Sequence, residues 1–451
     1  MLKFGGTSLE DERGFERVAK IVRAHERWQP VVVVSAMSRV TNALLSCLKT
    51  AAGGDDQAAA RVLEEHFGRH LRVADNLGAT ARACVHLMIE DARREISELL
   101  KSACLRRQAH ARWQDLIASH GERLCAGLLT AVLCEHGLAA SYVDARRCIL
   151  TDEEYGRATP LKEETEKRTR AELAPLLADS SIPVLGGFIA ATVSGATTTM
   201  GRGSSDYTAT LVGAALHARE AQIWSDVDGV MTADPRLVKT ARTVERLSYE
   251  EAAELARFGA KVLHPKTIQP AIEKGIPVRI RNSRVPEGAG TLVSAQAEAS
   301  PRVVKAIAHR MGLTVAEVTS TPEHLANGFM SAISDLCARH STLVDTWTTS
   351  ERGVSLSFGD GGVPPLILRG LKGVGEVEVK RGRAVVCLIS DRSRDAQPLA
   401  ARVGHIIKNI CPEFNPHATQ GRGLAFFVDD EFAGEVVTRL HHAFVERDER
   451  E

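Results

Sequence analysis

The sequence predicts an α/β protein in which a parallel-rich sheet between helices is followed by smaller β-rich units. The first observation is an opening pattern of apolar strand, helix and apolar strand over residues 3–4, 11–28 and 31–34. Uniformly apolar strands are typical of a parallel sheet that is covered on both faces. The second observation is a change of texture after about Leu292, where a small, polar linker at residues 294–301 leads into short strands and helices. The third is the length, since 451 residues exceed one ordinary domain.

A long helical stretch interrupts the alternation of strands and helices in the first part. Residues from Thr41 to about His136 contain runs of strong helix formers, and Ile96, Leu99 and Leu100 share one helix face. We therefore expect a helical insertion there. Further elements are expected at residues 182–185, 208–217, 221–224, 249–258 and 277–280. In a doubly wound sheet of this kind, ligands bind at the carboxyl ends of the strands.

The second part is interpreted as two βαββαβ units in tandem. The elements of the first unit are expected at residues 313–318, 328–340, 343–348, 353–358, 364–371 and 376–379. Those of the second unit are expected at residues 384–389, 398–410, 423–428 and 432–445, which leaves it without its last strand. We predict that a spare strand at residues 303–308 completes its sheet. Two such repeats are typical of a small-molecule sensing module. The expected domains are residues 1–295, 302–380 and 381–451.

Composition disfavours several classes of protein. Lys plus Arg and Asp plus Glu number 57 each, and the resulting net charge of zero argues against a nucleic-acid-binding protein, which carries a basic surplus. Apolar runs such as residues 31–34 are strand-sized, so we expect no membrane span. The nine cysteines form no C-x-x-C pair, and no secretory segment precedes the first strand. We therefore expect a cytoplasmic protein with reduced thiols.

Two glycine-containing segments at predicted strand ends and helix starts are candidates for binding anions. They are Lys3-Phe4-Gly5-Gly6-Thr7-Ser8 and Gly201-Arg202-Gly203-Ser204-Ser205-Asp206. Glycines let backbone N–H groups approach phosphate oxygens, and a helix start adds its positive dipole end. Lys3 supplies a full charge, Arg202 can hold a carboxylate with its fork, and Asp206 can orient a lysine or a metal-bound water. A tight turn and a capped helix are the alternative interpretations.

Two further segments carry weaker signals. Asp226 and Asp228 follow a predicted strand, where a solvated turn is an equal interpretation. Lys261 lies beside a glycine, and His264 before a proline is more typical of a packed loop than of a general base. Positive charges around glycine-rich strand ends suit phosphoryl transfer, which needs alignment and charge neutralisation. No Gly-x-x-x-x-Gly-Lys-Ser/Thr loop occurs, which disfavours the common nucleotide cradle.

Together these segments resemble the aspartate kinase family. The similar motifs, in the family's order, are Lys3-Phe4-Gly5-Gly6-Thr7-Ser8, Ser35-Ala36-Met37 with Val40-Thr41-Asn42, Gly187-Phe188-Ile189, Ser205-Asp206-Tyr207-Thr208-Ala209 after Arg202-Gly203, and Asp226-Val227-Asp228-Gly229. Thr348-Thr349-Ser350-Glu351 after Val344-Asp345 resembles the tandem ACT domains of the lysine-sensitive type. The resemblance implies an amino-acid-kinase fold followed by two ferredoxin-like ACT units. It also implies transfer of the γ-phosphoryl group of ATP to the β-carboxylate of L-aspartate, giving 4-phospho-L-aspartate on the way to lysine, threonine and methionine.

The resemblance also implies roles for individual residues. Lys3 would stabilise the transferring phosphoryl group, and Asp206 would organise the catalytic centre. The amino acid would be held by Ser35, Thr41, Glu122, Phe188, Arg202 and Ser205, with Arg202 on its α-carboxylate and Glu122 near its ammonium. The nucleotide would be held by Lys3, Gly5, Gly6, Ser8, Ser225, Asp226, Met231, Arg236 and Lys261. Mg²⁺ would arrive with ATP rather than in a dedicated protein site. An effector would contact Asn327, Gly328, Asp345, Ser350 and Glu351, and the protein would be a homodimer.

Several positions depart from the family pattern. Arg39 stands where the family usually has a glycine, Ser204 replaces another glycine, and Met231 stands in place of a tyrosine. In the sensing part, Leu343 stands where relatives place a serine, and residues 321–329 keep few polar side chains. We therefore expect weak inhibition by lysine or a response to another amino acid. Two alternatives stay open, namely a kinase of another acidic amino acid, which Arg39 suggests, and a catalytically weak amino-acid sensor.

Overall fold

The computed structural model describes most of the chain. The described residues are 1–201, 203–260, 263–296, 303–320, 328–340, 342, 344, 346–350, 353–359, 361–390, 396–411, 414, 416–418 and 423–447. They divide into two compact units, and each is discontinuous in sequence. The first unit consists of Met1–Gly229 and His264–Ala295, and the second consists of Val230–Leu263 and Gln296–Glu451.

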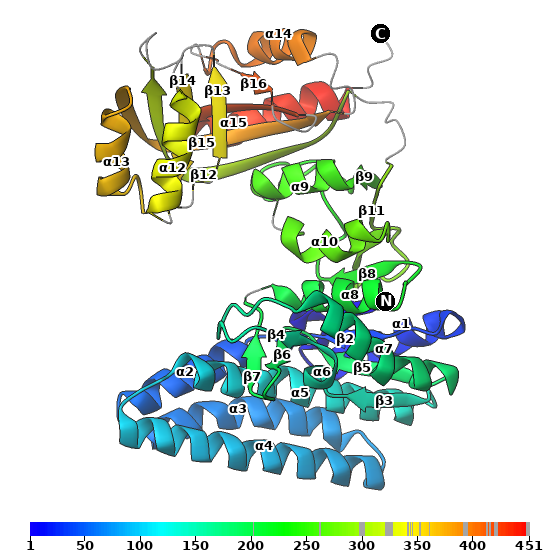
Figure 1. The fold of residues 1–451 in the computed structure, drawn as a ribbon. Helices are drawn as coiled ribbons and strands as arrows, with labels where there is room; N and C mark the ends of the chain where they lie inside the picture. Colours follow the sequence, from blue (N-terminus) through cyan, green and yellow to red (C-terminus); the bar gives the residue numbers. More distant parts are fainter. Residues whose placement is uncertain are drawn as a thin grey trace. The chain divides into compact units, whose positions relative to one another are not determined.

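The first unit is a helix-covered sheet (Figure 1). Its elements are β1 (Leu2–Phe4), η1 (Gly6–Leu9), α1 (Glu12–His25), η2 (Glu26–Trp28), β2 (Val32–Val34), α2 (Val40–Ala52), α3 (Asp56–Asp75), α4 (Ala79–Arg106), α5 (Ala111–Glu135), β3 (Ala140–Val143), α6 (Ala145–Cys148), β4 (Leu150–Thr151), α7 (Lys162–Ala178), β5 (Ile182–Gly186), β6 (Ile189–Thr192), β7 (Thr197–Thr199), α8 (Ser204–Ala215), β8 (Ala221–Ser225), α10 (Pro265–Glu273), β10 (Val278–Asn282) and β11 (Thr291–Ser294). Its main strands run in the order β3-β5-β2-β1-β8-β10-β11. All these neighbours pair in parallel except β10 with β11. A smaller sheet joins β4, β6 and β7.

The register brings the carboxyl ends of the central strands to one edge. Phe4 of β1 pairs with Val34 of β2 and with Trp224 of β8, and Val34 pairs with Gly186 of β5. All three residues of β1 and of β2 are buried, which explains why these strands are apolar apart from Lys3. The segments that follow β1, β2, β5 and β8 therefore meet at this edge, and they carry most of the predicted site residues.

The predicted helical insertion is formed by α2, α3, α4 and α5. Helix α3 packs against α2 and α4, as Figure 1 shows, and α5 lies against the sheet. Helix α5 is long and apolar enough to cross a membrane, but 72% of its apolar window is buried inside the protein. It is therefore packed as the core helix of this unit, with Ile117, Cys125 and Leu129 fully buried.

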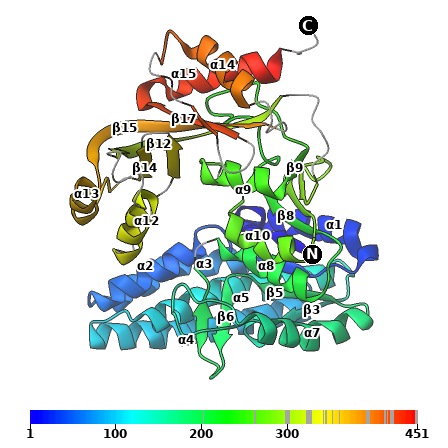
Figure 2. The same cartoon turned by 45° about the horizontal axis from the view of Figure 1, so that its top comes forward.

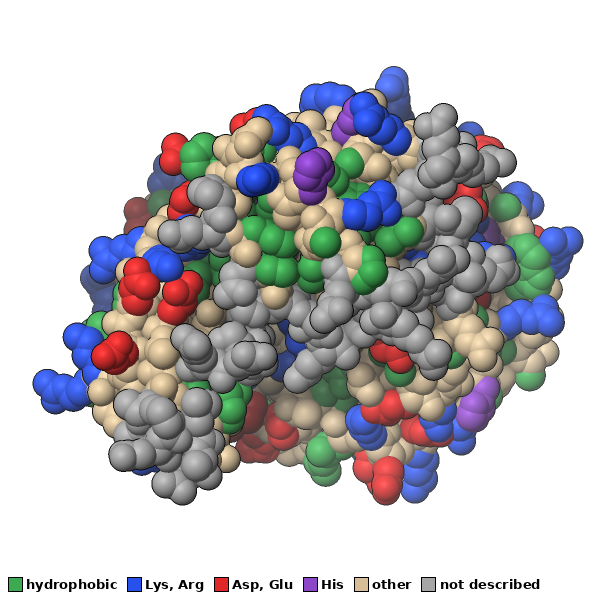
Figure 3. All heavy atoms as spheres, turned by 90° about the horizontal axis from the view of Figure 1, so that it is seen from above, with side chains coloured by type: hydrophobic (Ala, Val, Ile, Leu, Met, Phe, Trp, Pro, Cys, Tyr) green, Lys and Arg blue, Asp and Glu red, His purple; other side chains and the backbone are tan. Residues whose placement is uncertain are grey.

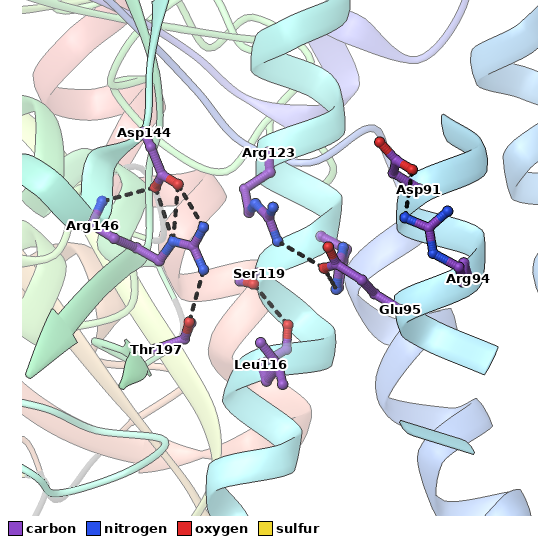
Figure 4. Close-up of polar contacts among 10 residues, drawn as sticks. Asp91, Arg94, Glu95, Leu116, Ser119, Arg123, Asp144, Arg146 and Thr197 are labelled. Atoms are coloured by element: carbon purple, nitrogen blue, oxygen red, sulfur yellow. Dashed lines mark hydrogen bonds and ion pairs between the residues drawn. The ribbon is translucent and has the colours of Figure 1, made fainter. Parts of the chain in front are cut away.

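Polar side chains make contacts within the insertion and, separately, between α6 and the small sheet (Figure 4). Arg123 of α5 points toward Glu95 of α4, with Nη1 3.6 Å from Oε2. Arg146 forms an ion pair with Asp144 at 2.6 Å and donates to Thr197 Oγ1 at 3.0 Å. These contacts give the polar faces of α4, α5 and the β3–α6 turn a structural role.

The second unit contains one sheet that runs through both predicted ACT units. Its elements are β9 (Arg246–Ser248), α9 (Tyr249–Arg257), β12 (Val304–Thr319), α12 (Phe329–Arg339), β13 (Thr346–Ser350), β14 (Gly353–Phe358), α13 (Pro365–Lys372), β15 (Glu376–Ser390), α14 (Ala396–Ile407), β16 (His417–Ala418), β17 (Gly423–Asp429), α15 (Asp430–His441) and the π-helical turn η4 (His442–Glu446). The strand order is β13-β14-β12-β15-β17-β16. Helices α12 and α13 pack on the part of the sheet formed by β14 and the second half of β12, and α14 and α15 pack on the part formed by β17 and the first half of β12 (Figure 2).

Two long strands differ from the sequence prediction. We predicted separate strands at residues 303–308 and 313–318, but the structure has the single strand β12, and β15 likewise merges two predicted strands. Gly312 in β12 and Gly382 in β15 have φ of 74° and 64°, and β12 has register shifts at 310–313 and 313–315. An irregularity that bends a strand without ending it is a β-bulge.

A segment of the predicted kinase part is built into this second unit. The N–H of Ile307 on β12 donates to the carbonyl of Thr232 at 2.8 Å, and the hydroxyl of Thr232 lies 2.9 Å from Nε2 of the buried His441 on α15. Lys305 on β12 forms an ion pair with Glu251 on α9 at 2.8 Å, with side chains only 3% and 0% exposed. Residues 230–263 and the ACT-type sheet therefore form one body. On the face drawn in Figure 3, basic and acidic side chains are interspersed, in keeping with the balanced charge.

Candidate active site

Backbone hydrogen bonds tie the segments at the strand edge together. The N–H of Gly5 donates to the carbonyl of Trp224 at 3.0 Å, that of Ser35 to Phe4 at 3.0 Å, and that of Gly187 to Val34 at 2.7 Å. Each bond joins a residue just beyond one strand to a residue at or next to the end of the neighbouring strand. The predicted phosphate segment and the predicted amino-acid segments are therefore parts of one continuous edge.

Lys3 and Asp206 form an ion pair at this edge. Lys3 Nζ lies 2.7 Å from Asp206 Oδ1, and the side chains are 11% and 18% exposed. Lys3 extends from the central strand β1, and Asp206 lies in the first turn of α8, where a carboxylate interacts favourably with the helix dipole. Because an ammonium carries three N–H donors, Lys3 can hold Asp206 and an oxygen of a ligand at the same time.

Close backbone contacts explain two of the glycines. A Cβ on Gly6 would lie 2.5 Å from the carbonyl oxygen of Ala36, and one on Gly187 would lie 2.7 Å from Cβ of Ser205. Any side chain at these positions would push apart the loops after β1 and β2, or β5 and the start of α8. The buried Ser8 hydroxyl lies 2.8 Å from Oγ of Ser283, so within the described residues it already has a protein partner.

Glu122 is a carboxylate in an unusual environment. Its side chain lies in the middle of α5 and the residue is 3% exposed, against Gly186 at the end of β5. Burial raises the pKa of Glu122 to about 8, opposed by hydrogen bonds from backbone N–H groups, including that of Ala36. Its Oε2 atom is buried and has no hydrogen-bond partner among the described residues. Because an ionised carboxylate buried without a donor is costly, the free protein favours the protonated form of Glu122, and a ligand ammonium would favour the carboxylate.

The remaining predicted amino-acid residues lie on the same edge segments. Ser35 follows β2 directly, Thr41 is in the first turn of α2, and both are half-buried. Phe188 follows β5 with a φ of 66°, and its N–H donates to the hydroxyl of the buried Thr208 at 2.9 Å. Ser205 is buried in the first turn of α8. The structure therefore brings these four residues to the edge that holds Lys3, Asp206 and Glu122.

The predicted nucleotide and effector residues divide between the two units. Ser225 ends β8 at the strand edge, and the exposed Asp226 follows it. Met231 and Arg236 belong to the second unit, where the exposed Arg236 forms an ion pair with Asp234 at 2.6 Å and lowers the pKa of that carboxyl. Gly328 precedes α12 with a φ of 86°, and Ser350 ends β13. Five predicted residues lie outside the described residues, namely Arg202, Lys261, Asn327, Asp345 and Glu351.

Two other polar residues, His264 and Asp115, form hydrogen bonds with the protein itself. His264 is exposed and caps the start of α10, with Nδ1 accepting from the N–H of Lys266 at 3.3 Å, so it has a structural contact of its own. Asp115 of α5, which the sequence did not single out, accepts hydrogen bonds from Gly156 and Thr199 and fixes the loop beside β7. Within the part of the chain that the structure describes, no group of three or more His, Cys, Asp or Glu side chains could hold a metal ion.

Arg39 adopts the backbone conformation that explains the family's glycine. It precedes α2 with a φ of 72°, in the left-handed region that glycine adopts without penalty. We expect Arg39→Gly to be more stable than Arg39→Ala by about 1 kcal/mol, because both remove the side chain but only glycine removes the left-handed strain. Urea unfolding of the two variants measures the difference. Equal free energies of unfolding would contradict a strained residue 39.

Comparison with known proteins places the chain in a family. Residues 1–282 match the amino acid kinase family. The chain is 34% identical to the lysine-sensitive aspartokinase 3 of Escherichia coli over 460 residues, which cover 97% of this chain and 97% of that protein. The chain belongs to the aspartokinase family. It is also 32% identical to the chloroplastic aspartokinase 3 of Arabidopsis thaliana, over 99% of this chain and 82% of that protein.

Solved structures of the aspartokinase family share the whole fold. The E. coli aspartokinase III in complex with aspartate and ADP has a TM-score of 0.81 at 33% identity and covers 98% of both chains. The same enzyme in complex with lysine and aspartate has a TM-score of 0.77 at 32% identity, covering 98% of this chain and 99% of that one. The predicted resemblance and fold class are confirmed: an amino-acid-kinase fold is followed by ACT-type regulatory domains.

Proposed function

We propose that this aspartokinase-family chain transfers the γ-phosphoryl group of ATP to the β-carboxylate of L-aspartate, giving 4-phospho-L-aspartate and ADP. This is the first step toward amino acids derived from aspartate. The observation that carries the proposal is the Lys3–Asp206 ion pair on the same strand edge as the buried Oε2 of Glu122, which has no hydrogen-bond partner among the described residues. One feature suits a transferring phosphoryl group, and the other suits the ammonium of an amino acid.

The reaction requires no covalent intermediate with the protein and no general base. The β-carboxylate of aspartate is already ionised at neutral pH, with an ordinary pKa of about 4, so its oxygen can attack the γ-phosphorus without a general base. The bond between the γ-phosphorus and the oxygen of the leaving ADP breaks, and charge is spread over the phosphoryl oxygens. Lys3 would neutralise part of that charge, and Asp206 would hold the Lys3 ammonium in place. His264 is then not needed as a base.

The substrates would bind along the strand edge. Glu122 would accept the ammonium of aspartate, Arg202 would hold its α-carboxylate, and Ser35, Thr41, Phe188 and Ser205 would surround it. Gly5 and Gly6 would bring backbone N–H groups to the phosphates. Mg²⁺ would arrive with ATP and supply positive charge beside the phosphates, and the exposed carboxylate of Asp226 offers the hard oxygen ligand that Mg²⁺ prefers. The assignments of Ser8, Ser225, Met231, Arg236 and Lys261 to the nucleotide remain predictions from the resemblance.

The second unit would sense an amino acid. The complex of the E. coli relative with lysine supports an amino-acid effector for the family. We keep weak inhibition by lysine as a prediction, together with the effector residues, a homodimer and a cytoplasmic location. The division at residues 302–380 and 381–451 is likewise a proposal. Pairing of Ala306, Ile307 and Ala308 with Ile389, Leu388 and Cys387 supports the completion of the second ACT unit by the strand at 303–308.

A panel of acidic amino acids tests the proposed function. Purified protein is incubated with ATP, Mg²⁺ and hydroxylamine, and both ADP release and hydroxamate are measured with L-aspartate, D-aspartate, L-glutamate and N-acetyl-L-aspartate. We expect hydroxamate with L-aspartate and little with N-acetyl-L-aspartate, which lacks the ammonium that Glu122 would bind. Turnover of another acid in preference to aspartate would support the alternative kinase, and turnover of none would support a sensor.

A further inference from the structure

One arginine of the helical insertion forms hydrogen bonds to two loops of the candidate active site, the loop after β1 and the loop after β2. Arg69, near the end of α3, is half-buried and donates from Nη1 to the carbonyl of Ser38 at 2.7 Å. Its other amino nitrogen, Nη2, donates to the carbonyl of Glu10 at 2.8 Å. A single guanidinium therefore bridges two backbone carbonyls that are far apart in the sequence. Hydrogen bonds from a charged, planar donor are among the stronger ones in proteins.

The two carbonyls belong to the segments that carry the predicted site residues. Glu10 immediately follows η1, which begins at Gly6 of the phosphate segment. Ser38 lies in the loop between β2 and α2, after Ser35 and before Thr41. The two loops are joined directly by one further bond, in which the N–H of Ser38 donates to the carbonyl of Gly6 at 3.1 Å. The two hydrogen bonds of Arg69 therefore form a second link between the loop after β1 and the loop after β2.

The bond to Ser38 also acts on the strained backbone of Arg39. The carbonyl of Ser38 belongs to the peptide that precedes Arg39, and the φ of Arg39 sets the orientation of that peptide. A φ of 72° is unfavourable for arginine, so the surrounding contacts must hold it. The hydrogen bond from Arg69 favours this orientation, and the following helix α2 starts at Val40 with Thr41 in its first turn.

We propose that Arg69 is a positioning residue for phosphoryl transfer, which fixes the loop that would hold the phosphates against the loop and helix start that would hold the amino acid. The inference rests on the proposed function. Arg69 itself touches neither substrate in this account. It acts through the carbonyls of Ser38 and Glu10, so its loss displaces the two loops relative to one another while the Lys3–Asp206 pair remains.

Arg69→Met tests this role, with Arg72→Met as a matched control. Arg72 lies one turn further along α3, is 62% exposed and is 3.8 Å from Glu12, so its loss removes a surface charge and one exposed ion pair. We expect Arg69→Met to lower kcat/KM for aspartate by about a hundredfold, because small displacements of reacting groups cost that much. Arg72→Met should leave it unchanged. Arg69→Lys, which keeps the charge and can still donate to a carbonyl, should recover part of the loss.

Hydrogen exchange provides a readout that does not depend on activity. In Arg69→Met, and more weakly in Arg69→Lys, amides in residues 5–10 and 35–41 should exchange faster than in the unaltered protein, with no such change in Arg72→Met. A purely structural role would lower thermal stability while kcat, KM and exchange in these two segments stayed at control values, and that result would overturn the inference. Absence of aspartate-dependent hydroxamate with the unaltered protein would instead contradict the proposed function, while exchange would still decide whether Arg69 holds the loops.

Discussion

Replacement of Lys3 by methionine is expected to lower kcat by about a thousandfold or more, because it removes the positive charge that would face the transferring phosphoryl group. Lys3 extends from the central strand of the sheet, and its ammonium is held 2.7 Å from Asp206. Steady-state ADP release with saturating ATP and aspartate measures the effect. Lys20→Met, on the exposed face of α1, is the matched control and should retain full activity.

The same substitution leaves Asp206 without its cation, which is a separate, structural effect. The double variant Lys3→Met with Asp206→Asn removes the unpaired charge while keeping similar volumes. We expect the double variant to unfold at a higher temperature than Lys3→Met alone and to remain as inactive. If the double variant regained activity with its stability, Lys3 would serve folding rather than catalysis.

Glu122→Gln is expected to raise KM for aspartate by about a hundredfold, since a neutral amide replaces the carboxylate that would pair with the ammonium. KM for ATP should change little, because Glu122 is assigned to the amino acid alone. Steady-state kinetics with each substrate varied in turn measures both constants. An equal rise of the two constants would point to a general disturbance of the strand edge and would contradict the assignment. Asp115→Asn, another buried carboxylate of α5 that bonds only to protein groups, is a useful comparison.

The raised pKa of Glu122 predicts a pH dependence of the free energy of unfolding in the protein without ligands. In the folded state the pKa is about 8, against an ordinary value of 4.5, so the folded protein holds this proton over a pH range in which the unfolded chain has lost it. The contribution to stability is therefore complete below about pH 4.5 and is lost as pH rises to about 8, by up to roughly 4 kcal/mol. Glu122→Gln should lack this loss. Urea unfolding of both proteins between pH 5 and pH 8.5 measures the difference, and parallel pH profiles would contradict a buried, protonated Glu122.

Much of the strand edge could be predicted from local sequence. Lys3-Phe4-Gly5-Gly6 predicts a strand followed by a glycine turn in which the backbone packs closely against a neighbour. In the structure, the neighbour of Gly6 is the carbonyl oxygen of Ala36. The separate strands predicted on either side of Gly312 and of Gly382 were wrong, because these glycines lie at irregularities within the long strands β12 and β15. A glycine indicates that the backbone adopts an unusual conformation, but only the strands that pair with it decide between a turn and a bulge.

Helix α7 and strand β3 were not predicted at all, because neither has a strong apolar period of its own.

Long-range contacts account for the rest of what the sequence did not reveal. Arg69 is one of many charged residues on a helix, and its bonds reach 31 and 59 residues back along the chain. Glu122 is one of several polar residues in the first half of α5, between His120 and Arg123, and nothing in the periodicity distinguishes a surface carboxylate from one buried against Gly186. Its site role came from the family resemblance alone. The resemblance likewise marked Arg39 as unusual, and the structure adds the reason, which is a left-handed backbone.

Transfer of oxygen from aspartate to phosphate tests the central claim most directly. The protein is incubated with ATP and L-aspartate that carries ¹⁸O in both oxygens of the β-carboxylate, and hydroxylamine is added to cleave the product at its acyl carbon. Because a carboxylate oxygen would bridge carbon and phosphorus in 4-phospho-L-aspartate, the released phosphate should contain one ¹⁸O atom, which shifts its ³¹P resonance. Released phosphate without ¹⁸O would mean that water, rather than the β-carboxylate, accepts the phosphoryl group, and would contradict the proposed function.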